Sequence, residues 1–369
     1  MQYSQYEQIG AKMQRKMKVA IRVDSSTVIG SGHLMRCLTF AERMRREKDA
    51  EVHFISRELD GNLFRKIREA GFFLHALPRH DLNDNLAGYA AWLTVPQSVD
   101  AADTKEILQE LGKIDRLVVD SYALDIEWEK EMRCFVDEIF VIDDLANRRH
   151  DCDVLLEQGF RVNQAMRYEG LVSAHCKLLL GPAYALLRDE FYKVKKHLRQ
   201  RDGIIRNVLV FYGGSDLTNE TMKALHALTT FSLSKSKVTA DVVVGTGNSH
   251  RDEVEEYCGY FPWIRYHCQV DNMAELMNSA DLALGAGGTT TIERCFLGLP
   301  ALVTVTAENQ EAGCAYCAQL GIVECLGWHE VVTDAIILEA LRGMTRDKLL
   351  MMTKSCGQWS PQGDAELCL

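Results

Sequence analysis

The chain has 369 residues, of which 47% are hydrophobic and 25% are charged, a composition typical of a soluble globular protein. Its 52 acidic and 42 basic residues give a formal net charge of −10, which argues against nucleic acid or an anionic membrane as the partner. The apolar runs are only as long as strands, so we expect no membrane insertion. At roughly 150 residues per domain, the length predicts two domains.

The first sixteen residues are polar and contain no apolar core like that of a secretory signal. Met17 opens the run MKVAIRVD, which has the pattern of a first strand, so residues 1–16 are predicted to form an N-terminal extension. Of the twelve cysteines, only Cys314 and Cys317 form a C-x-x-C pair, and no second pair stands at zinc-ligand spacing. We therefore expect structural thiols in a reducing compartment, and a cytoplasmic protein.

Short apolar runs alternate with helix-length amphipathic stretches in the first half of the chain. The predicted strands are Val19–Val23, Val52–Ser56, Phe73–Ala76, Leu117–Asp120, Ile139–Asp143, Val154–Leu156 and Leu178–Leu180. The predicted helices are Gly32–Lys48, Gly61–Ala70, Asp103–Leu111, Ile126–Cys134 and Pro182–Lys195. Continuous apolar strands that alternate with helices predict a parallel sheet covered on both faces.

A charged stretch, Lys193–Arg206, predicts a linker, after which the alternation restarts. The first strand predicted beyond it opens the stretch NVLVFYGGSD and runs into a glycine turn. The further predicted strands are Thr239–Val244, Ile264–His267, Asp281–Gly285 and Ala301–Val305. The fold class is therefore α/β, with two domains of similar plan at residues 17–200 and 201–369. Ligands bind beyond the carboxyl ends of strands in such sheets, so two facing domains predict a cleft site.

The run GSGH follows the first strand and leads into the first helix. Gly30 and Gly32 let the backbone approach a ligand closely, and the first amides of a helix attract anions. The positive end of the helix disfavours imidazolium, so we expect a neutral His33 that can accept a proton as a general base. Asp24, at the end of the preceding strand, is the nearby carboxylate that could reverse this. Arg36, one turn further along, is a candidate substrate-binding residue with Asp24 and the two glycines.

A second glycine turn follows the strand that ends at Gly285. Gly287 and Gly288 precede three threonines at a helix start, a geometry suited to diphosphate. Thr289 and Thr290 would offer amides and hydroxyls, and Glu293 could reach the hydroxyls of a ribose. Alternatively, Thr290 and Glu293 have the spacing of a capping box, which would need no ligand.

Polar residues after other strands should face the same cleft. Asn309 and Gln310 follow one strand of the second domain, although a turn or a helix cap would also explain them. Gly213 and Gly214 follow the strand that opens this domain, and Tyr122 follows a strand of the first domain. All five are candidate substrate-binding residues.

Acidic pairs raise the possibility of a metal site. Asp143 and Asp144 end one strand, and Asp151 and Asp153 match the D-x-D motif of metal-dependent glycosyltransferases. That short motif often matches by chance, and here it precedes a strand. We therefore predict no metal and no cofactor.

Six stretches of the sequence, taken together and in order, indicate a family resemblance. They are VAIRVDSSTVIGSGHLMRCLTFAERM, VVDSYALD, VIDDLANRRHDCDVLLEQ, GPAYALLRDEFY, VFYGGSD and GGTTTIERCFLGLPALVTVTAENQE. In this order they resemble the hydrolases of pseudaminic acid biosynthesis that act on UDP-2,4-diacetamido-2,4,6-trideoxy-β-L-altropyranose. The resemblance extends from Met17 to about Gly321. A more distant resemblance is to the glycosyltransferase that adds N-acetylglucosamine to lipid I.

The resemblance implies a GT-B fold, in which two Rossmann-like domains hold the active site between them. It also implies that water displaces UDP at the anomeric carbon of a UDP-sugar substrate. The family's catalytic histidine falls on His33, and its nucleotide loop falls on Gly287–Glu293. Its cleft tyrosine matches Tyr122, and its sugar-contacting asparagine matches Asn309. The arginine of YALLRDEF is Arg188, a further candidate for substrate binding.

Two other interpretations remain open. A GT-B glycosyltransferase would pass the sugar to an acceptor instead of water, and a regulator would bind the UDP-sugar without turnover. The sequence fixes neither the stereochemistry of the sugar nor the oligomeric state. The C-terminal tail is expected to cross back onto the first domain, as is common in the GT-B fold.

Overall fold

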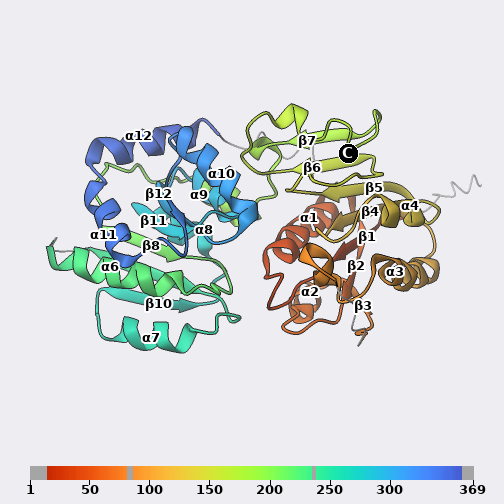
Figure 1. Cartoon of the computed structure of the whole chain (residues 1–369), viewed down its shortest axis with the longest axis horizontal. Coiled ribbons are helices and arrows are strands. Elements are labelled where there is room, and N and C mark those ends of the chain that lie inside the picture. The colour runs from red at the N-terminus through yellow and green to blue at the C-terminus, as the bar shows by residue number, and fades with distance from the viewer. Residues whose placement is uncertain (1–14, 81–85, 235–237, 360–369) are drawn as a thin grey trace, which may run out of the picture.

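The computed structural model describes residues 15–80, 86–234 and 238–359. Most of the predicted N-terminal extension, residues 1–14, and the end of the C-terminal tail, residues 360–369, lie outside this part of the chain. Two parallel sheets form two lobes side by side, as Figure 1 shows. Among the described residues, no helix is long and apolar enough to cross a bilayer.

The first sheet has seven strands in the order β3-β2-β1-β4-β5-β6-β7. They are β1 (Lys18–Val23), β2 (Glu51–Arg57), β3 (Phe73–Leu77), β4 (Ile114–Asp120), β5 (Val136–Ile142), β6 (Val154–Glu157) and β7 (Lys177–Leu180). The helices of this half are α1 (Gly32–Lys48), α2 (Phe64–Glu69), α3 (Gln97–Leu111), α4 (Ile126–Met132) and the short 3₁₀ helices η1 (Gly88–Leu93), η2 (Gln164–Met166) and η3 (Pro182–Tyr184).

The second sheet has six strands in the order β10-β9-β8-β11-β12-β13. They are β8 (Asn207–Phe211), β9 (Thr239–Val244), β10 (Ile264–Cys268), β11 (Leu282–Ala286), β12 (Ala301–Val305) and β13 (Val323–Trp328). The helices that pack with it are α5 (Asp189–Lys195), α6 (Glu220–Ser234), α7 (Arg251–Gly259), α8 (Met273–Ser279), α9 (Thr290–Phe296), α10 (Glu308–Gln319), α11 (Asp334–Gly343) and α12 (Arg346–Gly357).

Strand β1 illustrates why these sequences form sheets that are covered on both faces. Val19, Ile21 and Val23 point to one face, where they join the core that contains the apolar side of α1. Ala20 points to the opposite face and joins a second core with α3 and α4. Successive residues of a strand face opposite sides, so a strand buried on both faces must be apolar throughout.

The chain enters the second half before the predicted boundary at residue 200. Ala185, Leu187 and Phe191 are buried in the core of the second half, together with residues of α8 and α9. At the other end of the chain, the ring of Trp359 lies edge-on to Phe160, with centroids 5.8 Å apart. Phe160 follows β6, so the chain after α12 returns to the junction between the halves.

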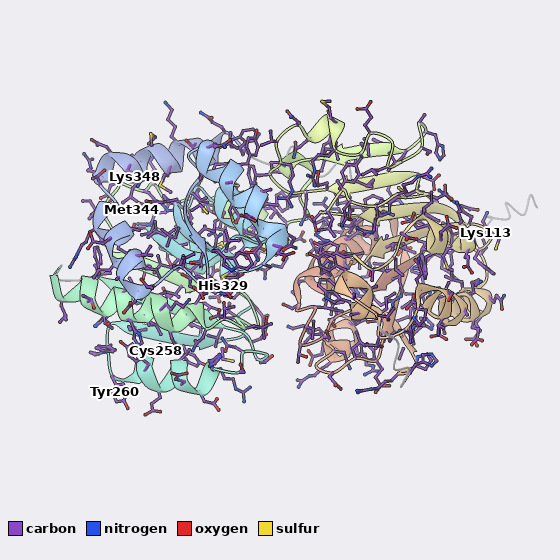
Figure 2. The ribbon with its side chains drawn as sticks, in the orientation of Figure 1. Lys113, Cys258, Tyr260, His329, Met344 and Lys348 are labelled. Carbon is purple, nitrogen blue, oxygen red and sulfur yellow. The ribbon has the colours of Figure 1, made fainter. Side chains whose placement is uncertain are left out.

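The carboxyl ends of the two sheets face each other. Figure 2 shows Lys113 at the outer side of the first half, and β4 begins directly after it. Tyr260 lies at the outer side of the second half, shortly before β10 begins. The amino-terminal ends of the strands in both sheets therefore point away from the other half, and the carboxyl ends point toward it. In each sheet the strand order reverses once, at β1/β4 and at β8/β11, and parallel sheets bind ligands at such switch points.

Candidate active site

His33 and Asp120 meet at the switch point of the first sheet. His33 lies in the first turn of α1, after β1, and Asp120 is the last residue of the neighbouring strand β4. The His33 Nδ1 lies 2.6 Å from Asp120 Oδ1. A carboxylate accepts hydrogen bonds, so the Nδ1 carries the proton and the Nε2 is left as an acceptor. This is the tautomer that a general base requires.

Arg36 fixes the carboxylate of Asp120 from the next turn of α1. Its Nε and Nη2 donate to the two oxygens of Asp120 at 2.6 and 2.7 Å, a bidentate pair. Burial alone would raise the pKa of Asp120, but Arg36 and His33 outweigh it and hold this pKa well below its usual range. Asp120 is therefore a permanent anion behind the histidine.

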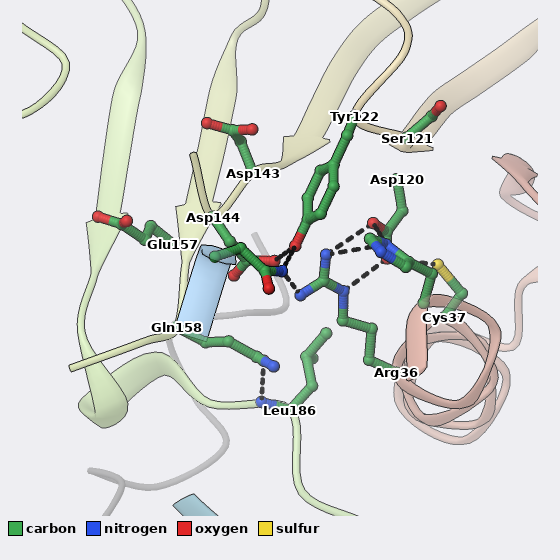
Figure 3. A network of polar contacts seen from close by, with 12 residues as sticks. Arg36, Cys37, Asp120, Ser121, Tyr122, Asp143, Asp144, Glu157, Gln158 and Leu186 are labelled. Carbon is green, nitrogen blue, oxygen red and sulfur yellow. Dashed lines mark hydrogen bonds and ion pairs between the residues drawn. The ribbon is translucent and has the colours of Figure 1, made fainter. Parts of the chain in front are cut away.

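The same guanidinium joins Asp120 to a second carboxylate, as Figure 3 shows. Arg36 Nη1 donates to Asp144 Oδ2 at 2.6 Å, and Tyr122 Oη donates to the same oxygen at 2.6 Å. Burial raises the pKa of Tyr122 well above its usual value, so its hydroxyl keeps its proton. Arg36 is thus engaged by two protein carboxylates, which favours a positioning role over the predicted direct contact with substrate.

Two aromatic rings contact His33, and a third ring packs against both of them. Tyr122 lies edge-on to the imidazole with centroids 4.6 Å apart, and Trp92 lies at 5.8 Å. Trp92 stacks on Tyr122, and Tyr89 packs edge-on against both. Tyr89 and Trp92 come from η1, a helix that the sequence pattern did not predict. They give the cavity beside His33 a partly apolar wall.

The predicted nucleotide loop lies on the other side of the cleft, after β11. The backbone at Gly287 packs so closely on α10 that a Cβ there would lie 1.9 Å from Cys314 Sγ. Helix α9 begins at Thr290 without a side-chain cap. Glu293 contacts Arg188 Nη2 at 3.3 Å and does not form the alternative capping box. Burial raises the pKa of Glu293, and Arg188 opposes this rise.

Two adjoining cavities of about 340 and 520 Å³ are lined by both halves, and the predicted site residues that they share are Gly32, Arg36, Gly288, Thr289 and Gln310. The predicted site residues that line the smaller cavity are Gly32, His33, Arg36, Tyr122, Gly287, Gly288, Thr289, Asn309 and Gln310. Those that line the larger cavity are Gly30, Gly32, Arg36, Arg188, Gly213, Gly214, Gly288, Thr289, Thr290, Glu293 and Gln310. All predicted site residues except Asp24 therefore border one continuous cleft.

The two halves touch directly within this cleft. Asn309 Nδ2 donates to Tyr122 Oη at 3.4 Å, and Arg161 Nη2 donates to the backbone oxygen of Asn309 at 3.3 Å. Ser31 Oγ lies 3.1 Å from the position of a Cβ on Gly214. A glycine at 214 therefore allows the loop after β8 to approach the loop before α1.

Asp24 lies outside the cleft, contrary to the prediction. It is buried, and its Oδ1 accepts from Arg22 Nη1 at 2.6 Å and from the backbone amide of Arg57 at 2.7 Å. Arg22 in turn pairs with Asp100 inside the first half. Asp24 therefore belongs to a buried structural ion network. The carboxylate that faces His33 is Asp120.

The acidic residues considered as metal ligands are paired with other side chains. Asp143 accepts from Arg148 Nη1 at 2.8 Å, and Asp144 is held by the Arg36 network. Arg133 holds both Asp151 and Asp153 of the D-x-D motif. Across residues 15–80, 86–234 and 238–359, no three His, Cys, Asp or Glu side chains come together as a metal-binding group.

Comparisons with known proteins agree with this architecture. Residues 207–360, which contain the whole second sheet, match the glycosyltransferase family 28 C-terminal domain. The chain superposes on MurG of Acinetobacter baumannii with a TM-score of 0.62, covering 94% of this chain and 96% of that one at 15% identity. At this identity the likeness concerns the fold, and it confirms the predicted GT-B arrangement.

Two relatives match across both halves. The UDP-2,4-diacetamido-2,4,6-trideoxy-β-L-altropyranose hydrolase of Campylobacter jejuni is 25% identical, with 83% of this chain and 97% of that protein covered. An uncharacterized protein of Methanocaldococcus jannaschii is 28% identical over 80% of this chain, and the match spans only 57% of that longer protein. The chain therefore has the GT-B fold, a second half like that of family 28 glycosyltransferases, and similarity over most of its length to a UDP-sugar hydrolase.

Proposed function

We propose that the protein is an enzyme that hydrolyses a UDP-linked 2,4-diacetamido-2,4,6-trideoxy sugar, with water displacing UDP at the anomeric carbon. The observation that carries the proposal is His33, which is held by the buried Asp120 and lines the smaller cavity together with Gly287, Gly288 and Thr289 of the opposite half. Similarity to the Campylobacter hydrolase supports the choice of substrate.

The shape of the cleft supports a particular placement of the substrate. The diphosphate would lie against Gly287–Thr290, which borders both cavities and whose backbone amides can approach it closely. Glu293 would accept hydrogen bonds from the ribose. The sugar would occupy the smaller cavity beside His33, with Tyr122 and Asn309 as neighbours.

In the proposed reaction, His33 Nε2 takes a proton from water as the water attacks the anomeric carbon. The charge of Asp120 stabilises the imidazolium that forms. The bond from the anomeric carbon to the diphosphate oxygen breaks, and UDP leaves as an anion stabilised by the amides of the loop. Diphosphate is a good leaving group, so no strong acid is required.

Replacement of Glu293 by alanine is expected to weaken UDP binding by about 1.5–3 kcal/mol, or about 10–150-fold in Kd, the value of a hydrogen bond to a charged group. Calorimetry with UDP measures this loss. Glu275→Ala is the matched control, because Glu275 is exposed on α8 and lines neither cavity. Equal affinity of Glu293→Ala and the wild type would remove Glu293 from the nucleotide site.

Turnover is expected to survive a chelator, because the acidic residues considered as metal ligands are held by arginines. The rate of UDP release is measured with and without EDTA. Loss of the rate in EDTA with recovery on adding Mg²⁺ or Mn²⁺ would contradict metal independence and would return Asp143 and Asp144 to consideration as ligands.

The competing function is a GT-B glycosyltransferase, which the family 28 match at residues 207–360 favours. The test is UDP release by the purified protein from UDP-diacetamido sugars without any acceptor. Release that yields the free sugar supports hydrolysis. Release that requires an added acceptor supports a transferase, and tight binding without release under either condition supports a regulator.

A further inference from the structure

Arg294 is a buried cation directly beneath the proposed diphosphate loop. Its side chain is 2% exposed, and among the residues that the structure describes no carboxylate lies within ion-pair distance of it. Burial lowers the pKa of this guanidinium, yet arginine remains protonated in proteins. Among the described residues the charge of Arg294 therefore has no ion-pair partner, and the nearby carboxylate of Glu293 offsets the effect of burial on its pKa only in part.

The guanidinium joins the two ends of the loop. Arg294 Nη2 donates to the backbone oxygen of Ala286 at 2.8 Å and to Thr291 Oγ1 at 2.9 Å. Ala286 ends β11 and Thr291 lies in α9, so the bonds bracket the segment from Gly287 to Thr290. Gly285 leaves room for the guanidinium, because a Cβ there would lie 2.5 Å from Arg294 Nη1.

The guanidinium of Arg294 has only some of its hydrogen-bond partners within the protein. Arg294 Nε is buried and has no hydrogen-bond partner. The neighbouring carboxylate, Glu293, attracts the charge of Arg294 from beyond ion-pair distance, but its own ion pair is with Arg188. A buried charge without a counter-ion is costly, and it becomes less costly when an anion binds nearby. The anion placed closest to Arg294 by the proposed function is the diphosphate.

We propose that Arg294 is the positioning residue of the diphosphate loop and that the bound diphosphate serves as its counter-ion. The inference rests on the proposed UDP-sugar function and extends it to a residue that does not border the cleft. Arg294 acts in two ways, by holding Ala286 and Thr291 in place and by making the loop electrostatically positive. A ligand without phosphate gains nothing from the second effect.

Calorimetry with UDP and with uridine separates the two effects. Arg294→Gln keeps a hydrogen-bond donor but removes the charge, and we expect it to weaken UDP binding at least about tenfold while uridine affinity changes less than about twofold. Arg294→Lys keeps the charge and should retain most of the UDP-to-uridine preference. The control is Arg201→Gln, at the opposite end of α9, where Arg201 donates to the backbone oxygen of Leu297 at 2.8 Å. This control should lower the Tm without changing the preference.

Parallel losses of UDP and uridine affinity in Arg294→Gln would show a purely structural role and overturn the inference. If the glutamine variant does not fold, the lysine variant decides, and a lost preference in folded Arg294→Lys overturns the inference as well. If both variants bind UDP and uridine as tightly as the wild type does, the inference about Arg294 is wrong, but the proposed function is not affected. A wild-type protein that binds neither UDP nor uridine would instead contradict the proposed function itself.

Discussion

Turnover of the His33→Asn variant is expected to fall by about 10²–10⁴, the usual contribution of a positioned general base. Asparagine is well accepted at the start of a helix, so α1 should remain intact. UDP affinity should stay close to that of the wild type, because the nucleotide is assigned to the other half. Steady-state kinetics and a UDP titration of the same preparation give both values.

The control for His33 is a histidine that also faces an aspartate but lies elsewhere. His80 Nε2 lies 3.0 Å from Asp103 and borders neither cavity, so His80→Asn should leave kcat unchanged. Near-normal turnover in folded His33→Asn would contradict the assignment of the base. Lost UDP binding would make His33 a binding residue.

Replacement of Asp120 by asparagine is expected to lower kcat by a similar factor, on the order of 10²–10⁴. Asparagine retains an acceptor for the Nδ1 proton but loses the negative charge that stabilises the imidazolium. The pKa of Asp120 lies well below its usual range, so the wild type keeps this charge at every pH at which the enzyme would work. The variant should also be less stable, because Arg36 loses one of its two carboxylate partners.

A double variant tests whether His33 and Asp120 act as one catalytic unit. If His33 and Asp120 act as one unit, the double variant His33→Asn with Asp120→Asn should be scarcely slower than either single variant. Asp103→Asn, which alters the partner of His80, controls for the loss of a histidine–aspartate pair outside the cleft. Fully multiplicative losses in the double variant would show that Asp120 acts independently of His33.

Most of the first sheet could be predicted from the sequence, because buried parallel strands form continuous apolar runs. The match is close for α1, whose predicted bounds Gly32–Lys48 are those observed. Strand β13 (Val323–Trp328) was missed, since its run VECLGW mixes polar and apolar residues at one edge of the sheet. The helix predicted at Pro182–Lys195 is interrupted by extended backbone at Ala185 and Arg188.

The site was harder to predict than the sheet, because it depends on strand order. Asp24 is nearer to His33 in the chain than Asp120, yet β4 lies beside β1 and brings Asp120 to the imidazole. Sequence spacing carries no information about that adjacency. Trp92 and Tyr89 lie in a short 3₁₀ helix without a periodic pattern, so only the folded chain reveals that Trp92 contacts His33 and that Tyr89 packs on Trp92.

The most direct test of the account is the fate of ¹⁸O when the reaction runs in H₂¹⁸O. If water attacks the anomeric carbon, the bond from carbon to the diphosphate oxygen breaks, and the released UDP contains no ¹⁸O from the solvent. Phosphorus NMR or mass spectrometry of UDP measures this, and it avoids the free sugar, whose anomeric oxygen exchanges with water. Unlabelled UDP released without any acceptor is the predicted result. Label in the terminal phosphate of UDP, or no release until an acceptor is added, would contradict the proposed hydrolysis at carbon.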